Sequence, residues 1–264
     1  YYLRKNWQQI NCVATDLTYS IAFHPIYPYF AAGTYNFCVV YDLTYSRPRI
    51  KCRLKHHTKL VITVVFHPRL LLLATGSKDH TVILYNLTAS PPTIQQKLVH
   101  HPSIIQCIIF HAILPIFVIG TNGGYGGYSS LILYNTTTLP FKMKDHCTHQ
   151  PCPALCVNFH PTFPILATGL FNHSVIIYDC LTSPMSILCQ LKHHTNSVHA
   201  VAFHQILPLF VTNSYDGKII LYDPSKLLLT IKYTFTHKCG KASFAVLHPN
   251  LPILAINILE PTVV

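Results

Sequence analysis

The chain has 264 residues, half of them hydrophobic and only 10% charged, so it is long enough to bury a sizeable core. Lys and Arg outnumber Asp and Glu by 19 to 8, and the net charge of +11 favours acidic partners, unless acidic residues are simply scarce in this composition. No run of about 18 uninterrupted apolar residues occurs, which argues against a membrane-spanning helix.

Cysteine usage indicates the redox environment. Most of the ten cysteines stand singly within apolar stretches, as Cys38, Cys107, Cys156 and Cys189 do. This is typical of reduced, buried thiols and not of a disulfide framework. The first residues also show no basic-then-apolar secretory leader. We therefore expect a reducing, cytoplasmic location.

A repeat runs along the whole chain. A Phe-His pair recurs, and the first residue of each copy is Phe23, Phe66, Phe110, Phe159, Phe203 and, as Leu, Leu247. A Tyr followed by Asp or Asn lies 25 residues before the next copy each time, at Tyr41, Tyr85, Tyr134, Tyr178 and Tyr222. A constant period of 43 to 49 residues predicts a repeat architecture.

Within one unit every segment favours a β-strand. Residues 63–66 and 72–75 are short apolar runs, residues 77–80 form a polar turn, and residues 81–85 are β-branched. A further strand is expected near residues 50–54, outermost in its unit. Four strands per unit, without helical periodicity, predict small antiparallel sheets that bury their faces against one another by radial stacking.

These motifs resemble the WD repeat of β-propellers. The resemblance rests on a His before the first strand, the Ala-Thr-Gly-Ser wording at residues 74–77, an acidic turn residue, and an aromatic-Asp pair at the end of the third strand. The FHPxxPxLATGS wording is also similar to WD-repeat proteins of giant DNA viruses and some microbes. The resemblance covers residues 1–264 as one domain, with repeats starting near residues 11, 55, 99, 147, 192 and 236.

The resemblance implies an all-β propeller of four-stranded antiparallel blades, with six repeats visible and the last one truncated. The sequence ends within the third strand of the sixth repeat, and residues 1–10 match a fourth strand. Two arrangements therefore stay open. Residues 1–10 complete the sixth blade and close a six-bladed ring, or the chain is a fragment of a longer, seven-bladed protein.

The resemblance also implies a buried hydrogen-bond network in each blade, formed in the family by His, Asp, a hydroxyl and Trp. The matching positions here are His57, His101, His149 and His194 for the His, Asp79 and Asp216 for the Asp, and Tyr85, Tyr134, Tyr178 and Tyr222 for the Trp. A Tyr hydroxyl lies elsewhere than an indole N–H, and Asn replaces Asp in some copies. We therefore expect departures from the family network. The His of each Phe-His pair is expected to be a repeated packing position.

One repeat carries an insertion between its second and third strands. The inserted segment includes a glycine-tyrosine run, namely Gly123, Gly124, Tyr125, Gly126, Gly127 and Tyr128. In propellers of this kind, the loops between the second and third strands surround one mouth of the channel. The glycines give mobility and the tyrosines suit an interface, so the loop is a candidate partner-binding site. The alternative is a tolerated insertion in a surface turn.

A second candidate site is a basic strand. Five cations, Arg47, Arg49, Lys51, Arg53 and Lys55, alternate with other residues in RPRIKCRLK. Period two predicts that all five lie on one face of an exposed edge strand. The pattern fits edge protection or binding of an acidic partner. Because no aromatic residues interleave with the cations, an acidic protein segment ranks above nucleic acid.

Neither a metal site nor a catalytic site is predicted. The ligand types in HCTHQPC (residues 146–152) suit zinc, but His149 already has a place in the repeat. Most carboxylates occupy repeat positions, which leaves Asp16 and Asp145 without an evident partner. We therefore expect no enzyme activity and no cofactor.

The function predicted from the sequence is that of a non-catalytic scaffold or substrate-recognition module that binds other proteins, in particular proteins with acidic segments. The alternative is a basic propeller that docks on nucleic acid or anionic lipid through the cationic strand. Phosphate binding weakens steeply with salt. A contact centred on Tyr125 and Tyr128 does not.

Overall fold

The computed structural model describes residues 17–45, 47–99, 103–123, 129–149, 152–224, 229–236, 241–248, 250–251 and 253–259. These residues form 22 β-strands and no helix. The strands make five four-stranded antiparallel sheets and one two-stranded sheet, which confirms the predicted all-β fold of antiparallel blades.

Each sheet uses strands that are consecutive in the chain. Blade 1 contains β1 (Ser20–Phe23), β2 (Tyr29–Gly33), β3 (Cys38–Asp42) and β4 (Arg49–Leu54), and blade 2 contains β5 (Val61–Phe66), β6 (Leu72–Ser77), β7 (Val82–Asn86) and β8 (Thr93–Leu98). Blade 3 contains β9 (Ile104–Phe110), β10 (Ile116–Asn122), β11 (Ser129–Asn135) and β12 (Lys142–His149), and blade 4 contains β13 (Ala154–Phe159), β14 (Ile165–Leu170), β15 (Val175–Asp179) and β16 (Ser186–Leu191). Blade 5 contains β17 (Val198–Phe203), β18 (Phe210–Ser214), β19 (Lys218–Asp223) and β20 (Thr230–Thr236), and the two-stranded sheet contains β21 (Lys241–Leu247) and β22 (Leu254–Leu259).

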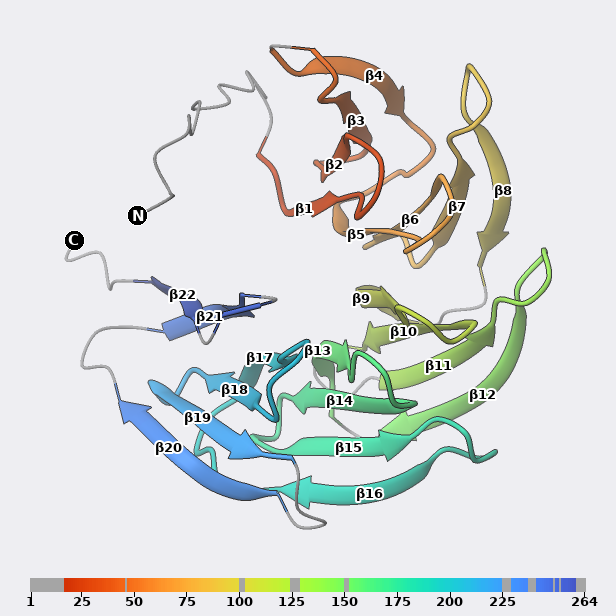
Figure 1. Ribbon diagram of the computed structural model, residues 1–264. Helices are drawn as coiled ribbons and strands as arrows, with labels where there is room; N and C mark the ends of the chain where they lie inside the picture. Colours follow the sequence, from red (N-terminus) through yellow and green to blue (C-terminus); the bar gives the residue numbers. More distant parts are fainter. Residues whose placement is uncertain are drawn as a thin grey trace.

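The sheets are arranged around a common centre (Figure 1). The first strand of each blade lies innermost and packs beside the first strand of the next blade, from β1 to β5 and onward to β21. The fourth strand of each blade lies on the outer wall (Figure 1). Among the described strands, β1 and the β21–β22 pair form the two ends of this arc.

The two middle strands of each blade are the core of the protein. Every residue of β6 is buried, and so are most residues of β7. Both faces of these strands are covered by neighbouring blades, so the sequence shows continuous apolar runs where a half-exposed strand would alternate. The outer strand β8 is exposed except near its end. Burial therefore falls from the centre of each blade to its outer edge.

Glycine at the end of the second strand lets neighbouring blades approach closely. A Cβ on Gly76 would lie 2.5 Å from Ile105 Cγ2 of blade 3, and a Cβ on Gly169 would lie 2.9 Å from the Val198 carbonyl oxygen of blade 5. Any side chain at these positions would push the blades apart. This contact explains the glycine in the repeated Ala-Thr-Gly wording.

The tight turn between the second and third strands contains a left-handed residue in three blades. His80 has φ of 69°, His173 has φ of 72°, and Gly217, at the same repeat position, has φ of 78°. Only glycine adopts this conformation without steric cost. The two histidines therefore hold a conformation that blade 5 obtains from glycine.

The histidine of each Phe-His pair caps the turn that follows the first strand. Its Nδ1 accepts two backbone N–H groups, from the second and third residues after it, and this holds for His24, His67, His111, His160, His204 and His248. A ring nitrogen that accepts must be unprotonated, so the proton of the neutral ring lies on Nε2.

Three of these rings also bind the next blade. Each donates from Nε2 to a backbone carbonyl oxygen of the next blade. The pairs are His24 with Leu70 (3.1 Å), His111 with Phe163 (3.0 Å) and His204 with Leu251 (3.1 Å). The repeated packing position expected from the sequence is therefore also a polar link between blades.

A β-bulge recurs in all five outer strands. One extra residue directly follows the residue that pairs with the repeat tyrosine, and the extra residues are Lys51, Gln95, Lys144, Leu188 and Lys232. A bulge bends an edge strand and interrupts its row of outward hydrogen-bonding groups. The outer edge of each blade is thus blunted by its backbone.

Candidate interaction surfaces

A buried triad joins two turns in blade 2. His57 Nδ1 lies 2.9 Å from Asp79 Oδ2, and His57 Nε2 lies 2.8 Å from Thr75 Oγ1. Burial lowers the pKa of His57, so the neutral ring donates from Nδ1 to the carboxylate and accepts the Thr75 hydroxyl. Burial opposes ionisation of Asp79, but hydrogen bonds from Thr81, the Thr58 N–H and His57 outweigh it and set the pKa to about 2.

Blade 5 repeats the triad. His194 Nδ1 lies 3.0 Å from Asp216 Oδ2, and Nε2 lies 2.8 Å from Thr212 Oγ1. Asp216 also accepts the Thr195 N–H at 2.8 Å. In both blades the His comes from the loop before the first strand and the Asp from the turn after the second strand. The triads therefore place these two sets of loops on one rim of the ring.

The repeat tyrosines differ from one another in the contacts of their hydroxyl groups. The Tyr222 hydroxyl lies 3.1 Å from His193 Nδ1, outside the triad. The Tyr85 hydroxyl is buried and has no hydrogen-bond partner of good geometry among the described residues. The rings of Tyr134 and Tyr178 are buried in their blades. Tyrosine thus keeps the packing role of the family tryptophan at these positions.

The network is less complete in the other blades. Blade 3 has Ile119 where the triads have threonine. In blade 4, Asn172 Oδ1 accepts the Ser174 hydroxyl at 2.6 Å. His101 lies outside the described residues, and of His149 only the backbone, at the end of β12, is described.

The rim formed by the loops before the first strands and the turns after the second strands is called the triad rim. Large side chains are exposed on it. The same repeat position in the turn after the second strand is Tyr35 in blade 1, Lys78 in blade 2 and Phe171 in blade 4, with Tyr35 65% and Phe171 45% exposed. The inserted loop of blade 3 lies at the same level, because β10 ends at Asn122 and β11 begins at Ser129. The Gly123 N–H donates to Ser129 Oγ, whereas Gly124, Tyr125, Gly126, Gly127 and Tyr128 lie outside the described residues.

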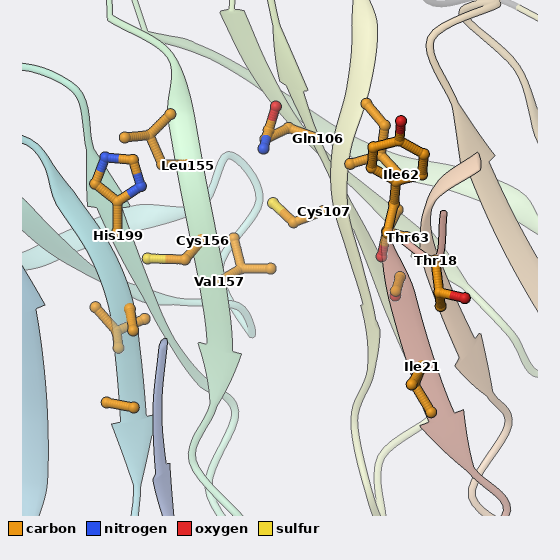
Figure 2. A pocket seen from close by; sticks show the side chains of 15 residues that line it. Thr18, Ile21, Ile62, Thr63, Gln106, Cys107, Leu155, Cys156, Val157 and His199 are labelled. Carbon is orange, nitrogen blue, oxygen red and sulfur yellow. The ribbon is translucent and has the colours of Figure 1, made fainter. Parts of the chain in front are cut away.

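A cavity of about 610 Å³ occupies the centre of the ring. It is lined by the first strands of the blades and the residues just before β1, and Figure 2 shows Thr18, Gln106 and His199 beside the apolar Ile62 and Leu155. Lys, Arg, Asp and Glu are absent from its described lining. The net positive charge of the protein is therefore carried elsewhere on the surface.

The basic strand β4 is the outer edge of blade 1, as predicted, but its cations do not share one face. Arg49 pairs with Asp42 and Arg53 pairs with Val39, and these two β3 residues point to opposite faces of the sheet. The bulge at Lys51 causes the switch, because one extra residue inverts the alternation beyond it. The one-face prediction was therefore wrong.

Tyrosine rings support two of the cations. The Arg49 guanidinium lies 4.1 Å from the centre of the Tyr45 ring, and Lys51 Nζ lies 4.7 Å from that of Tyr29. Arg47, Arg53 and Lys55 are exposed. Among the described residues, the His–Asp contacts of the triads are the two pairs within salt-bridge distance, so no described carboxylate forms a salt bridge with the basic strand. The pKa of Asp42 is lowered by hydrogen bonds from Thr44 and, to a smaller extent, by the charge of Lys51.

The described HCTHQPC residues have structural contacts. Cys152 Sγ accepts the Asn172 N–H at 3.0 Å, and Asp145 accepts the backbone N–H groups of His146 and Met185. Within the described ranges, no three His, Cys, Asp or Glu side chains are grouped to hold a metal ion. Asp16 lies outside those ranges.

Comparison with known families matches the repeat. The family model described as "WD domain, G-beta repeat" matches residues 49–86 and 185–223. Each matched segment runs from the outer strand of one blade through the third strand of the next. Two segments of the chain therefore match the WD repeat, and the described residues have the β-propeller fold. The matched segments contain the outer strands β4 and β16 and the complete triads of blades 2 and 5.

A solved WD-repeat structure shares the fold. The propeller resembles the crystal structure of Saccharomyces cerevisiae Sqt1, with a TM-score of 0.64 and 14% sequence identity, over 88% of this chain and 77% of that chain. No curated protein sequence matches the propeller. Among its described residues, no helix is long and apolar enough to cross a membrane.

Proposed function

We propose that this propeller is a non-catalytic scaffold that binds other proteins through its triad rim. One observation carries the proposal. Buried His–Asp–Thr triads fix the rim turns of blades 2 and 5. The corresponding turns of blades 1, 2 and 4 expose Tyr35, Lys78 and Phe171 to solvent. Fixed backbone with exposed aromatic and cationic side chains suits a protein interface, because little order is lost on binding.

The family and the chemistry of the chain agree with this role. WD-repeat propellers serve generally as protein-interaction scaffolds. Recognition of substrate proteins, in particular those with acidic segments, is the finer form of the proposal, and the net charge of +11 supports it. The eight described cysteines are free thiols, which supports the proposed reducing, cytoplasmic location.

The test is capture of partners from native cells after nuclease treatment. Phe171→Ser removes an exposed ring from the triad rim. Phe163→Ser, in the same blade, removes an exposed ring from the turn at the opposite end of β14 and is the matched control. We expect Phe171→Ser, or deletion of residues 123–128, to lose partners that Phe163→Ser retains. Equal capture by all three variants would refute the rim as the binding surface.

The second candidate function is docking on nucleic acid or anionic lipid through the basic strand. The five exposed cations without a described ion pair favour it. Binding would then fall steeply between 50 mM and 200 mM salt and would not need the rim. Capture of nucleic acid in place of protein, abolished by neutralising β4, would support this second function.

A further inference from the structure

The cations of β4 exceed what edge protection requires. Every outer strand carries the same bulge, which already blunts the edge. Strand β16 has the same position in blade 4 and contains no charged residue. An outer strand of this propeller thus forms without cations, so the charges of β4 need another explanation.

The two strands differ in little besides charge. Strand β4 reads RIKCRL and β16 reads SILCQL, with Ile, Cys and Leu at the same three places. Their burial patterns are identical, and each has its bulge at the third residue. The shared residues specify the strand, and the three that differ, Arg49, Lys51 and Arg53, are therefore free to serve binding.

The bulge determines which kind of polyanion can contact all three cations of β4. Arg49 and Lys51 lie on the face of β3 that carries Asp42, because Lys51 contacts Tyr29 and Tyr29 pairs with Asp42. Arg53 lies on the opposite face. A flat membrane or a stiff duplex approaches from one direction and meets one of these faces. A flexible chain crosses the edge and reaches both.

The tyrosines beside β4 favour a peptide over single-stranded nucleic acid as the ligand. Sequence-tolerant binding of single strands uses aromatic faces on which bases stack. Beside β4, a face of Tyr45 is covered by Arg49, and Lys51 lies over Tyr29. The cations are thereby held in place, with fewer rotamers to lose on binding, whereas stacking on the same faces is blocked.

We infer that β4 binds a flexible acidic protein segment that crosses the outer edge of blade 1 and places carboxylates against Arg49, Lys51 and Arg53. The inference rests on the proposed scaffold function and names the chemistry of one partner. Arginine forks bind carboxylates in bidentate fashion, which suits a Glu- or Asp-rich segment. Because the bulge interrupts the outward ladder, side chains and not an added β-strand carry the recognition.

The test uses a labelled 12-residue peptide of alternating Glu and Ser, with a Gln-Ser peptide as the neutral control. The variant R49S/K51L/R53Q writes the β16 sequence into β4 and should preserve the fold. We expect it to weaken binding of the acidic peptide at least about tenfold at 100 mM salt. The reciprocal variant S186R/L188K/Q190R writes the β4 sequence into β16, and we expect it to add a second site.

Three outcomes would overturn the inference. The first is equal binding of the acidic peptide by wild type and R49S/K51L/R53Q. The second is tighter binding of a 12-nucleotide oligo-dT than of the peptide, with the same loss in the variant, which indicates nucleic acid. The third is variant-sensitive binding to vesicles with 30% phosphatidylserine without peptide binding, which indicates a lipid surface.

The rim provides the means to separate this inference from the scaffold proposal. Phe171→Ser should leave binding of the acidic peptide unchanged, because Phe171 lies in the turn after β14, away from β4. Partner capture that needs Phe171 but not β4 would refute the acidic-segment inference and leave the scaffold intact. Peptide binding at β4 with no captured protein would refute the scaffold alone.

Discussion

The Nε2 of His111 donates a hydrogen bond to the Phe163 carbonyl oxygen across the boundary between blades 3 and 4, at 3.0 Å. The other imidazole nitrogen, Nδ1, accepts two N–H groups of its own turn, and the imidazole packs against Phe159 of blade 4. One side chain therefore orders a turn and joins two blades. Stability of the ring depends on such contacts, because each blade alone leaves its faces uncovered.

Replacement of the His111 side chain should lower the stability of the protein. We expect His111→Ala to lower the free energy of unfolding by about 2–4 kcal/mol, through loss of packing and of hydrogen bonds to buried backbone groups. Urea denaturation followed by fluorescence measures this. His146→Ala, at an exposed position of β12, is the control and should change stability by less than about 0.5 kcal/mol. Equal effects of the two changes would show that His111 is not a link between blades.

Acid should destabilise the propeller in the range of histidine titration. Burial lowers the pKa of His57, His67, His111, His160 and His194 in the folded protein. Below the unfolded value of about 6.5, the unfolded chain then binds more protons than the folded chain. The stability that these groups contribute is complete above pH 7 and falls as the pH drops through 6.5.

The carboxylates contribute in a lower window. The pKa of Asp79 is about 2 and that of Asp216 is also lowered, so their contribution is present above about pH 4 and is lost below it. Denaturation midpoints at pH 7.5, 6.5, 5.5 and 4.5 would check the histidine window, and midpoints at pH 3.5 and 2.5 would check the carboxylate window. A midpoint that stays constant from pH 7.5 to 4.5 would contradict the histidine prediction.

The left-handed turn residue of blade 2 offers a stabilising change. His80 has φ of 69°, where glycine avoids the steric cost of a Cβ. We expect His80→Gly to raise the free energy of unfolding by about 0.5–1 kcal/mol. Gly217→Ala, at the same position of blade 5, should lower it by a similar amount or more. A thermal shift assay of the two variants should show midpoints that move in opposite directions.

The glycine between blades 2 and 3 should tolerate no side chain. A Cβ at Gly76 would lie 2.5 Å from Ile105 Cγ2 and 2.8 Å from Thr63 Cγ2. We expect Gly76→Ala to destabilise the protein by about 1–3 kcal/mol, because the neighbouring strands must move. The double variant Gly76→Ala with Ile105→Ala removes the Cγ2 methyl group that the new Cβ would meet. A double variant with stability restored toward that of Ile105→Ala would confirm the clash, and strict additivity would argue against it.

Tyr222 and Tyr85 occupy the same repeat position but differ in their hydroxyl contacts, which allows a paired comparison. Tyr222→Phe removes a hydroxyl that bonds His193 and should cost about 1 kcal/mol. Tyr85→Phe removes a buried hydroxyl without a hydrogen-bond partner of good geometry among the described residues and should be neutral or slightly stabilising. Equilibrium unfolding of both variants in the same buffer gives the difference directly. A larger loss from Tyr85→Phe would reverse the assignment of these roles.

The repeat arithmetic was sufficient to predict the blades. The constant distance from each tyrosine to the next Phe-His pair located the strands, and it placed the insertion between β10 and β11. The change of strand face after Lys51 could not be predicted in the same way. Alternation in one strand predicts one face, but a bulge is a property of the register between two strands. Exposed Ile50, in the middle of the cations, is its consequence.

The roles of the histidines were predictable in part. The resemblance to the WD repeat implied that His57 and His194 are network residues, with Asp79 and Asp216 in the same network. The same reasoning saw the Phe-His histidines only as packing groups. The reach of Nε2 from His24 to the Leu70 carbonyl spans 46 positions in sequence, and it depends on how closely blades pack. Only the three-dimensional arrangement gives that distance.

The correspondence between RIKCRL and SILCQL has a consequence for how such proteins diversify. The two outer strands share Ile, Cys and Leu at three places, and the three places that differ are exposed in both strands and differ in charge. Selection therefore acts on those places blade by blade, with little penalty for folding. A propeller of this type acquires or loses a ligand by changing three codons, and its circumference works as a set of independently evolvable sites.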